Sequence, residues 1–379
     1  MKQVLAMLAA ALMTACSSGK PVSDALKVAY QDAFKMGTVV NRQMAMGRDS
    51  RSDALVDQHF NAVSPENDMK PEVIHPAPGQ WNWGPADNYV KYGNDRGLFV
   101  LGHTLVWHNQ TPDFFFKHQD GTPKSHDEMV EQMRSYIEAV AGRYDGKVNA
   151  WDVVNEIIDN DGSYRKTAWT NAFGGDGDEV VRLAFKFASQ YSPKSELYYN
   201  DFNAWRPTKR DGIARMVRML QKNGIRIDGV GIQAHWGLNF PKNEYITAAI
   251  DTFAALGVKV MITELDVDVL PLTREGQIIG KGMQDPQFQL EEFKEYFDPY
   301  RQGLPAEVEQ QQADRYAELM KIFYSRCDVI DRVTIWGVQD AQSWKNGYPI
   351  PNRTNYPLLF KRDYTPHKAL DALLRIPKK

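Results

Sequence analysis

The chain has 379 residues, of which 43% are hydrophobic and 25% are charged. These are ordinary globular proportions, so a sizeable core can be buried and wholesale disorder is excluded. The 45 Lys and Arg residues nearly balance the 48 Asp and Glu residues. The chain therefore has no net positive electrostatic field strong enough to attract nucleic acid or an anionic membrane surface. Aromatic residues make up 11% of the chain, and their flat faces suit both core packing and stacking on sugar rings.

The first element expected along the chain is an export signal. Residues 1–15 carry an early lysine, an apolar run and small residues before Cys16, which is the pattern of a bacterial lipoprotein signal peptide. Met13 departs from that pattern, because leucine usually stands three residues before the cysteine. The run is shorter than the ~20 apolar residues that span a bilayer, which disfavours a transmembrane anchor. We expect Cys16 to be acylated and residues 16–23 to form a polar tether, which places the protein on the outer membrane of a bacterial envelope, facing the periplasm or the outside.

From residue 24 onward, β-type segments alternate with helical patterns, and no linker interrupts them. Segments rich in β-branched or aromatic residues predict eight strands, at 34–39, 62–65, 98–107, 148–155, 196–203, 229–236, 259–267 and 332–339. Helical periodicity is clearest at 127–143, 179–190, 210–222, 244–256 and 307–325. Eight βα units predict one (β/α)8 barrel domain over residues 24–379, in the α/β class, with its active site at the carboxyl ends of the strands.

A doubly wound open sheet is the alternative architecture. That fold normally carries a glycine-rich phosphate turn after its first strand, and residues 37–40, Gly-Thr-Val-Val, offer none. The barrel is therefore the favoured reading of the alternating pattern.

The stretch from Pro271 to Leu304 fits neither a strand nor a regular crossover, and it is longer than most connections in compact domains. We expect it to decorate the seventh βα loop and to contain a short helix. Two readings stay open, a rim of a substrate cleft and simple surface decoration.

Polar and aromatic residues gather at the carboxyl ends of the predicted strands, where the chemistry of a barrel belongs. They occur as Ser-Pro-Glu-Asn (64–67) with Lys70 close behind, Gly-His-Thr-Leu-Val-Trp-His (102–108), Trp-Asp-Val-Val-Asn-Glu (151–156), Gln-Ala-His-Trp (233–236), Ile-Thr-Glu-Leu-Asp (262–266), and Trp-Gly-Val-Gln-Asp (336–340) with Trp344 following.

Two of these residues form a candidate catalytic pair. Cleaving a glycosidic bond with retention takes one carboxyl group that donates a proton and one carboxylate that attacks. Glu156 and Glu264 end the fourth and seventh predicted strands, which face each other across a barrel mouth. Retention requires carboxyl groups about 5–5.5 Å apart and inversion about 6.5–9.5 Å, a difference that a sequence cannot measure. The alternative reading makes each glutamate a surface ion-pair partner.

Neighbouring residues favour the catalytic reading. An amide at Asn155 can hold a sugar 2-hydroxyl, but adjacent side chains on a strand point to opposite faces. We therefore predict that the strand loses its regular geometry near Asn155, so that Asn155 and Glu156 reach one cleft. Asp266 shares its strand face with Glu264, and His235 ends the adjacent strand, which predicts a hydrogen-bonded chain Asp266–His235–Glu264 that keeps Glu264 ionised and oriented. A purely structural histidine is the alternative.

Other chemistries are disfavoured by spacing. His103 and His108 differ by an odd number, so on a strand they point to opposite faces, and no Cys or acidic cluster completes a metal site. The run 159–162, Asp-Asn-Asp-Gly, lacks the first ligand and the closing glutamate of a calcium loop. Gly-x-Ser-x-Gly is absent, so there is no esterase nucleophile elbow. We expect no metal, and we expect Cys327, the only cysteine besides Cys16, to be a buried thiol.

In this order and spacing, residues 102–108, 151–156 and 262–266 resemble the motifs of glycoside hydrolase family 10. Thr-Ile-Trp-Gly-Val-Gln-Asp and Asn-Tyr-Pro-Leu-Leu-Phe follow at 334–340 and 355–360, and the resemblance spans residues 24–374. It implies a retaining endo-β-1,4-xylanase on a (β/α)8 barrel, without a cofactor. Its partners are then xylan and xylo-oligosaccharides, and we expect a monomer that touches a membrane only through its lipid anchor.

The resemblance also implies residue roles, carried over position by position. Glu156 becomes the proton donor and later base, Glu264 the nucleophile, and Asn155 the partner of the 2-hydroxyl. The residues implied to line the glycone subsites are Glu66, Asn67, Lys70, His103, Trp107, Gln233, His235, Trp336 and Trp344. A tight wall of Trp336 and Trp344 is expected to exclude the exocyclic hydroxymethyl group of glucose.

The sequence departs from the family pattern in three places. Pro71 follows Lys70, Asn109 replaces the usual serine, and the Pro271–Leu304 stretch is long, which puts tolerance of xylan branches in doubt. Two rival functions remain, a retaining β-1,4-glucanase on the same fold and a non-catalytic surface lipoprotein that only binds glycan. The second would be expected to have lost Glu156 or Glu264, and both are present.

Overall fold

The structure is a computed structural model that describes residues 23–279 and 283–377. The expected signal peptide, Cys16 and all of the expected tether except Ser23 lie outside these ranges. Within the described ranges, no helix has the length and apolar character needed to cross a membrane.

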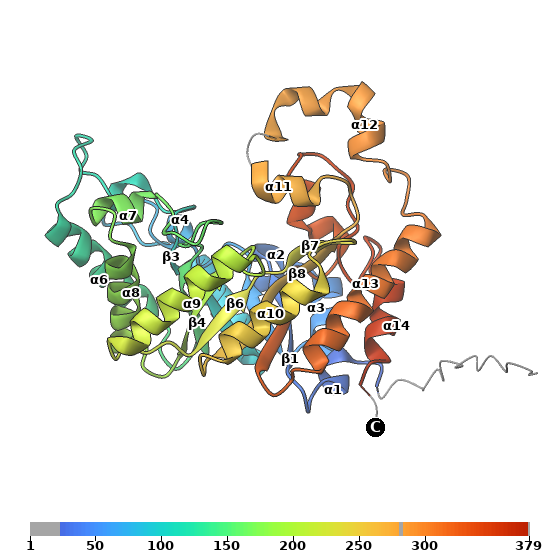
Figure 1. Cartoon of the computed structure of the whole chain (residues 1–379), viewed down its shortest axis with the longest axis horizontal. Helices are drawn as coiled ribbons and strands as arrows, with labels where there is room; N and C mark the ends of the chain where they lie inside the picture. The colour runs from blue at the N-terminus through green and yellow to red at the C-terminus, as the bar shows by residue number, and fades with distance from the viewer. Residues whose placement is uncertain (1–22, 280–282, 378–379) are drawn as a thin grey trace, which may run out of the picture.

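Eight parallel strands close into a barrel, which confirms the predicted (β/α)8 fold (Figure 1). The sheet runs in the order β6-β5-β4-β3-β2-β1-β9-β8, and pairing between β6 and β8 completes the ring. The strands are β1 (Lys35–Val40), β2 (Ala62–Pro65), β3 (Phe99–Val106), β4 (Ala150–Asn155), β5 (Glu196–Asp201), β6 (Gly229–Ile232), β8 (Lys259–Asp268) and β9 (Ile330–Ile335).

Two strand predictions need correction. The continuous strand predicted at 229–236 is divided, because Ala234 adopts a left-handed φ of 66° that a strand does not accommodate. Its second part is the short strand β7 (His235–Gly237), which pairs with the outer end of β8. The last predicted strand ends at Ile335 instead of residue 339, and Trp336 and the residues after it turn into the loop above the barrel.

A helix follows each barrel strand and covers its outer side (Figure 1). These helices are α3 (Ser50–His59), α5 (Gly84–Asp95), α6 (His126–Arg143), α8 (Gly177–Tyr191), α9 (Pro207–Lys222), α10 (Asn243–Ala254), α13 (Ala306–Tyr324) and α14 (Lys368–Leu374). Shorter helices are α1 (Leu26–Ala29), α2 (Arg42–Ala45), α4 (Pro71–Ile74), α7 (Ala168–Ala172), α11 (Thr273–Ile279) and α12 (Glu291–Phe297). Single 3-10 turns occur at η1 (Asp113–Phe115), η3 (Pro286–Gln289), η4 (Asp340–Gln342) and η5 (Trp344–Asn346).

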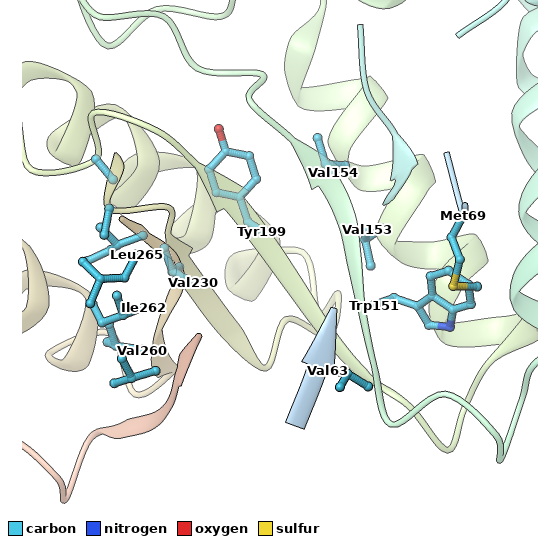
Figure 2. Close-up of a cluster of buried hydrophobic side chains, with 14 of the residues drawn as sticks. Val63, Met69, Trp151, Val153, Val154, Tyr199, Val230, Val260, Ile262 and Leu265 are labelled. Carbon is cyan, nitrogen blue, oxygen red and sulfur yellow. The ribbon is translucent and has the colours of Figure 1, made fainter. Parts of the chain in front are cut away.

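The main apolar core lies between the strands and these helices, and Figure 2 shows part of it. Trp151 and Val153 alternate with inward-facing residues on β4, as the strand period requires. Trp151 fits only because residue 102 is glycine, since a Cβ at Gly102 would lie 2.2 Å from its ring. Inside the barrel, a smaller layer packs at the base, made of Leu101, Ala150, Tyr198 and Met261.

The stretch predicted to decorate the seventh βα loop follows β8 and contains α11, η3 and α12. Figure 1 shows these helices as an extra lobe beyond the carboxyl ends of the strands. We call residues 271–304 the insertion. The buried thiol expected at Cys327 is a wrong prediction, because Cys327 is exposed. It lies in the turn between α13 and β9, where its backbone N–H donates to the Tyr324 carbonyl at 3.3 Å.

Candidate active site

A cavity of about 670 Å³ opens at the carboxyl ends of the strands. Twelve residues singled out from the sequence line it, namely Glu66, Asn67, Lys70, His103, Trp107, Asn155, Glu156, Gln233, His235, Glu264, Trp336 and Trp344. They lie at or just after the carboxyl ends of six barrel strands, β2, β3, β4, β6, β8 and β9, so the barrel topology alone brings them together. The two glutamates face the same cavity, as the catalytic reading requires.

Glu264 lies on β8 and is buried, with both carboxylate oxygens hydrogen-bonded. Asn200 Nδ2 donates to Oε1 at 2.7 Å, and His235 Nε2 lies 3.0 Å from Oε2. Asn200 is itself fixed, because Thr263 Oγ1 donates to its Oδ1 at 2.7 Å. Gly231 makes room for this amide, since a Cβ there would lie 2.4 Å from Asn200 Oδ1. The carboxylate is thus held in one orientation from two sides.

The predicted chain Asp266–His235–Glu264 is present. His235 Nδ1 lies 2.8 Å from Asp266 Oδ2, and Trp344 Nε1 donates to the same oxygen at 3.0 Å. Burial lowers the pKa of His235, but the charges and hydrogen bonds of Asp266 and Glu264 outweigh burial and raise that pKa to about 9. At neutral pH His235 is therefore an imidazolium that donates to both carboxylates.

Glu156 directly follows β4, and the strand loses its regular geometry there, as predicted. The pairing of β4 with β5 shifts register between Asp152 and Val154, and Glu156 has a left-handed φ of 58°. The carboxylate accepts hydrogen bonds from Gln233 Nε2 at 2.9 Å and from Trp107 Nε1 at 3.0 Å.

The pKa of Glu156 differs from the simple expectation for a general acid. Burial raises this pKa, but a protonated His108 and the hydrogen bonds from Gln233 and Trp107 bring it below its ordinary value. Burial also lowers the pKa of His108, so the contribution of His108 fades at neutral pH. Exclusion of water from the cleft favours the protonated form of the carboxyl. Glu156 therefore holds a proton more firmly when the cleft is filled.

Asn155 lies between the two glutamates. Its amide is 3.1 Å from Asn200 Nδ2, the group that also holds Glu264. Gln233 Nε2 is 3.5 Å from Asn155 and 2.9 Å from Glu156. A chain of amide contacts therefore runs from Glu264 through Asn200, Asn155 and Gln233 to Glu156.

The cavity also carries a group of charged and amide side chains at Glu66, Asn67 and Lys70. Lys70 Nζ donates to Asn67 Oδ1 at 2.8 Å and lies 5.0 Å from the centre of the Trp107 ring. Burial lowers the pKa of Lys70, although the charges of Glu264, Glu66 and Glu156 act in the opposite direction. Burial also raises the pKa of Glu66.

Aromatic rings form the wall above these groups. Trp336 lies edge-on between His103 and His235, at ring distances of 6.0 and 6.2 Å. Trp344 stacks on Tyr348 at 4.9 Å and contacts His235 at 4.7 Å. Such faces cover the apolar side of a pyranose ring.

The prediction that His103 and His108 point to opposite faces of one strand is wrong. The strand β3 ends at Val106, so His108 lies beyond it, and both histidines line the cavity. His103 Nδ1 is engaged by Asp152 Oδ2 at 2.8 Å. In the described part of the chain, no three His, Cys, Asp or Glu residues are grouped as metal ligands.

Several functional residues escaped the sequence analysis. Asn200 is the penultimate residue of β5. It begins the run Asn-Asp-Phe-Asn, the same kind of polar strand end that marked the other strands, so the signal was present. The insertion contributes Gly276, Gln277 and Ile278 to the cavity wall. At these positions it forms a rim of the cleft and is not simple surface decoration. The remaining lining residues are not among the predicted site residues; they are His108, Asn109, Gln110, Asp159, Asn160, Arg165, Phe202, Lys345 and Tyr348.

A closed (β/α)8 barrel with two buried carboxylates and aromatic walls in one cleft defines the class of barrel glycosidases. A family model for glycosyl hydrolase family 10 matches residues 25–376. The chain belongs to this family and is a glycoside hydrolase. It is 36% identical over 345 residues to endo-1,4-beta-xylanase A of Xylanibacter ruminicola, with 90% of each chain covered. It is 35% identical over 357 residues to an endo-1,4-beta-xylanase of Geobacillus stearothermophilus, covering 93% of this chain and 98% of that one.

Solved structures agree with this placement. A GH10 endoxylanase retrieved from a sugarcane soil metagenome superposes with a TM-score of 0.85 at 38% identity, covering 94% of this chain and all of that one (100%). Xylanase B from Clostridium stercorarium F9 superposes with a TM-score of 0.81 at 32% identity, covering 92% and 99%.

Proposed function

We propose that this glycoside hydrolase is a retaining endo-β-1,4-xylanase that cleaves internal bonds of xylan. The observation that carries the proposal is the contrast between the two carboxylates that line one cleft. Glu264 is fixed by an imidazolium and an amide, whereas Glu156 is held by an amide and an indole beside the titratable His108. The xylanases to which the chain is similar support the choice of substrate.

In the first step, Glu264 attacks the anomeric carbon of the sugar on the glycone side while Glu156 gives its proton to the glycosidic oxygen. The bond between that carbon and oxygen breaks, the aglycone chain leaves as an alcohol, and a glycosyl ester forms on Glu264. The imidazolium of His235 and the amide of Asn200 keep the carboxylate aimed at the anomeric carbon.

In the second step, the carboxylate of Glu156 removes a proton from a water molecule. That water attacks the same anomeric carbon, the ester bond to Glu264 breaks, and the product leaves with its original configuration. Glu156 ends the cycle protonated and Glu264 ends it ionised, so no cofactor is consumed. Asn155 binds the sugar 2-hydroxyl, a contact that strengthens as positive charge develops on the ring.

Two carboxylate variants test the proposal. Purified wild-type protein should release reducing ends from xylan, with oligosaccharide products that show internal cleavage, and Glu264→Ala should be inactive while still folded. Proton NMR of the first products should show the β-anomer before mutarotation. Faster hydrolysis of β-1,4-glucan than of xylan would favour the glucanase alternative, and binding of xylan without hydrolysis would favour the glycan-binding alternative.

We further propose that the enzyme is an exported, monomeric lipoprotein anchored by an acyl chain on Cys16. The charge-poor, apolar first segment that ends at this cysteine supports the proposal. In a bacterial host, detergent phase separation should place the wild-type protein in the detergent phase, and Cys16→Ser should move it to the aqueous phase. Unchanged partitioning of Cys16→Ser would contradict the anchor, and protease treatment of intact cells would show which face the enzyme occupies.

A further inference from the structure

The backbone at Glu156 takes a conformation that needs external support. Its φ of 58° lies in the left-handed region, which residues other than glycine rarely occupy. The Glu156 N–H donates to the Asn200 carbonyl at 2.9 Å, which fixes one side of the residue. The carbonyl side lies at the start of a loop, where no strand neighbour is available.

That loop folds back on itself as a short hairpin over residues 157–165. The Arg165 N–H donates to the Ile157 carbonyl at 2.7 Å, and Ile158 pairs with Tyr164 in an antiparallel bridge. A turn that includes Gly162, with a φ of 85°, reverses the chain. The hairpin returns Arg165 to a position beside Glu156, although the two residues are nine positions apart in sequence.

The side chain of Arg165 closes this arrangement. Its Nε donates to the Glu156 carbonyl oxygen at 3.0 Å. Nη1 lies 3.8 Å from Asp159 Oδ1, and the guanidinium lies 5.4 Å from the centre of the Phe202 ring. The side chain is 20% exposed and also lines the cavity, so the hydrogen bond to the carbonyl is partly shielded from competing water.

We propose that Arg165 is a positioning residue for Glu156. By holding the carbonyl oxygen, it fixes the peptide plane after Glu156 and thereby aims the carboxyl group at the glycosidic oxygen. Gln233 and Trp107 steady the carboxylate itself, but neither holds the backbone from which it extends. A general acid must reach the reacting oxygen within hydrogen-bond distance, so a small rotation at Glu156 weakens proton transfer. The inference rests on the proposed retaining mechanism.

The test compares aryl β-xylobiosides whose leaving groups differ in their need for a proton. A phenyl glycoside needs protonation by Glu156 as it leaves, whereas a 2,4-dinitrophenyl glycoside does not. For Arg165→Met we expect kcat/KM to fall ~10- to 100-fold on the phenyl substrate, and to stay within about twofold on the dinitrophenyl substrate because attack by Glu264 is unaffected. The kcat on the dinitrophenyl substrate should fall, since Glu156 also activates the water that hydrolyses the glycosyl ester. Added azide should restore this kcat, because azide attacks the ester without needing to lose a proton.

Arg210→Met is the matched control. Arg210 is also 20% exposed, and its guanidinium pairs with Asp211 instead of Glu156. Thermal unfolding and circular dichroism of both variants separate a folding defect from misplacement of the Glu156 carboxyl group. Arg165→Lys tests whether a positive charge without the Nε donor is enough to position Glu156. An equal loss of kcat/KM on both substrates, no loss, or a rise in KM alone would overturn the positioning role. A wild-type enzyme inactive on every xyloside and on xylan would instead reject the proposed function.

Discussion

Asn200 illustrates how much of this site depends on single buried side chains. Asn200→Ala removes the 2.7 Å hydrogen bond to Glu264 Oε1 and leaves the Thr263 hydroxyl without its acceptor. We expect kcat on xylan to fall ~10- to 100-fold, because a small misplacement of a reacting group can slow a reaction by about that much. Thr263→Val, which weakens only the support of Asn200, should cost less. Steady-state kinetics with both variants measure this, and an unchanged kcat in Asn200→Ala would show that His235 alone orients the nucleophile.

Trp344 carries the prediction on substrate choice. Its ring stacks on Tyr348 and its Nε1 donates to Asp266, so the wall has little freedom to move away from a hydroxymethyl group. Trp344→Ala opens that space, and the ratio of kcat/KM on cellotriose to that on xylotriose should rise about tenfold, within the range for one carbon-sized group in a pocket. Trp344→Phe, which loses the Nε1 donor but keeps a ring, should lower both rates with a smaller change in ratio. An unchanged ratio of the two kcat/KM values in Trp344→Ala would contradict steric exclusion of the hydroxymethyl group by Trp344.

At the scale of elements, the sequence predicted which strands carry the site and the irregular backbone near Asn155, but it missed the break after Gln233 and the end of the last strand. Twelve site residues could be found because chemistry-bearing side chains follow the strands at the same edge of the barrel. The break after Gln233 could not be found, since Ala234 has no sequence feature of a left-handed residue. Arg165 could not be found either, because its contact with Glu156 exists only once the hairpin has formed.

The insertion carries the prediction at this scale. Ile278 is 60% exposed and lines the cavity, and the Tyr348 hydroxyl donates to the Gly276 carbonyl at 2.7 Å, which ties α11 to the aromatic wall. Ile278→Ser removes apolar contact worth about 1 kcal/mol, so KM for xylan should rise roughly fivefold with little change in kcat. Tyr296→Ser is the control, because Tyr296 is 65% exposed on α12 and does not line the cavity. Equal effects of both substitutions would mean that the insertion acts through its fold and not through the cleft.

At the scale of the whole molecule, the buried charges at the barrel mouth affect both the stability of the fold and the chemistry of the site. Asp266, His235 and Glu264 pack together with almost no access to water, and removing one charge leaves the others uncompensated. Lys70 and Lys209 are also buried near the glutamates, and burial lowers the pKa of both lysines. The barrel therefore holds a charge arrangement suited to catalysis that a purely structural core would avoid.

This arrangement predicts a loss of stability in alkaline solution. The folded-state pKa of His235 is raised to about 9 from an ordinary value of 6.5, so the folded protein binds the proton more tightly than the unfolded chain. Protonation of His235 therefore stabilises the folded state by at most about 3 kcal/mol. This stabilisation is fully present below pH 6.5 and is lost as the pH rises through about 9. Lys70 and Lys209 have lowered pKa values in the folded protein, so their contribution to stability rises with pH instead of falling. The effect of His235 is therefore measured as the difference between the wild type and a His235 variant. The unfolding free energy of the wild type should fall between pH 7 and 10 more steeply than that of His235→Asn, measured by urea titration at each pH. Parallel pH curves for the two proteins would show that His235 does not carry this proton.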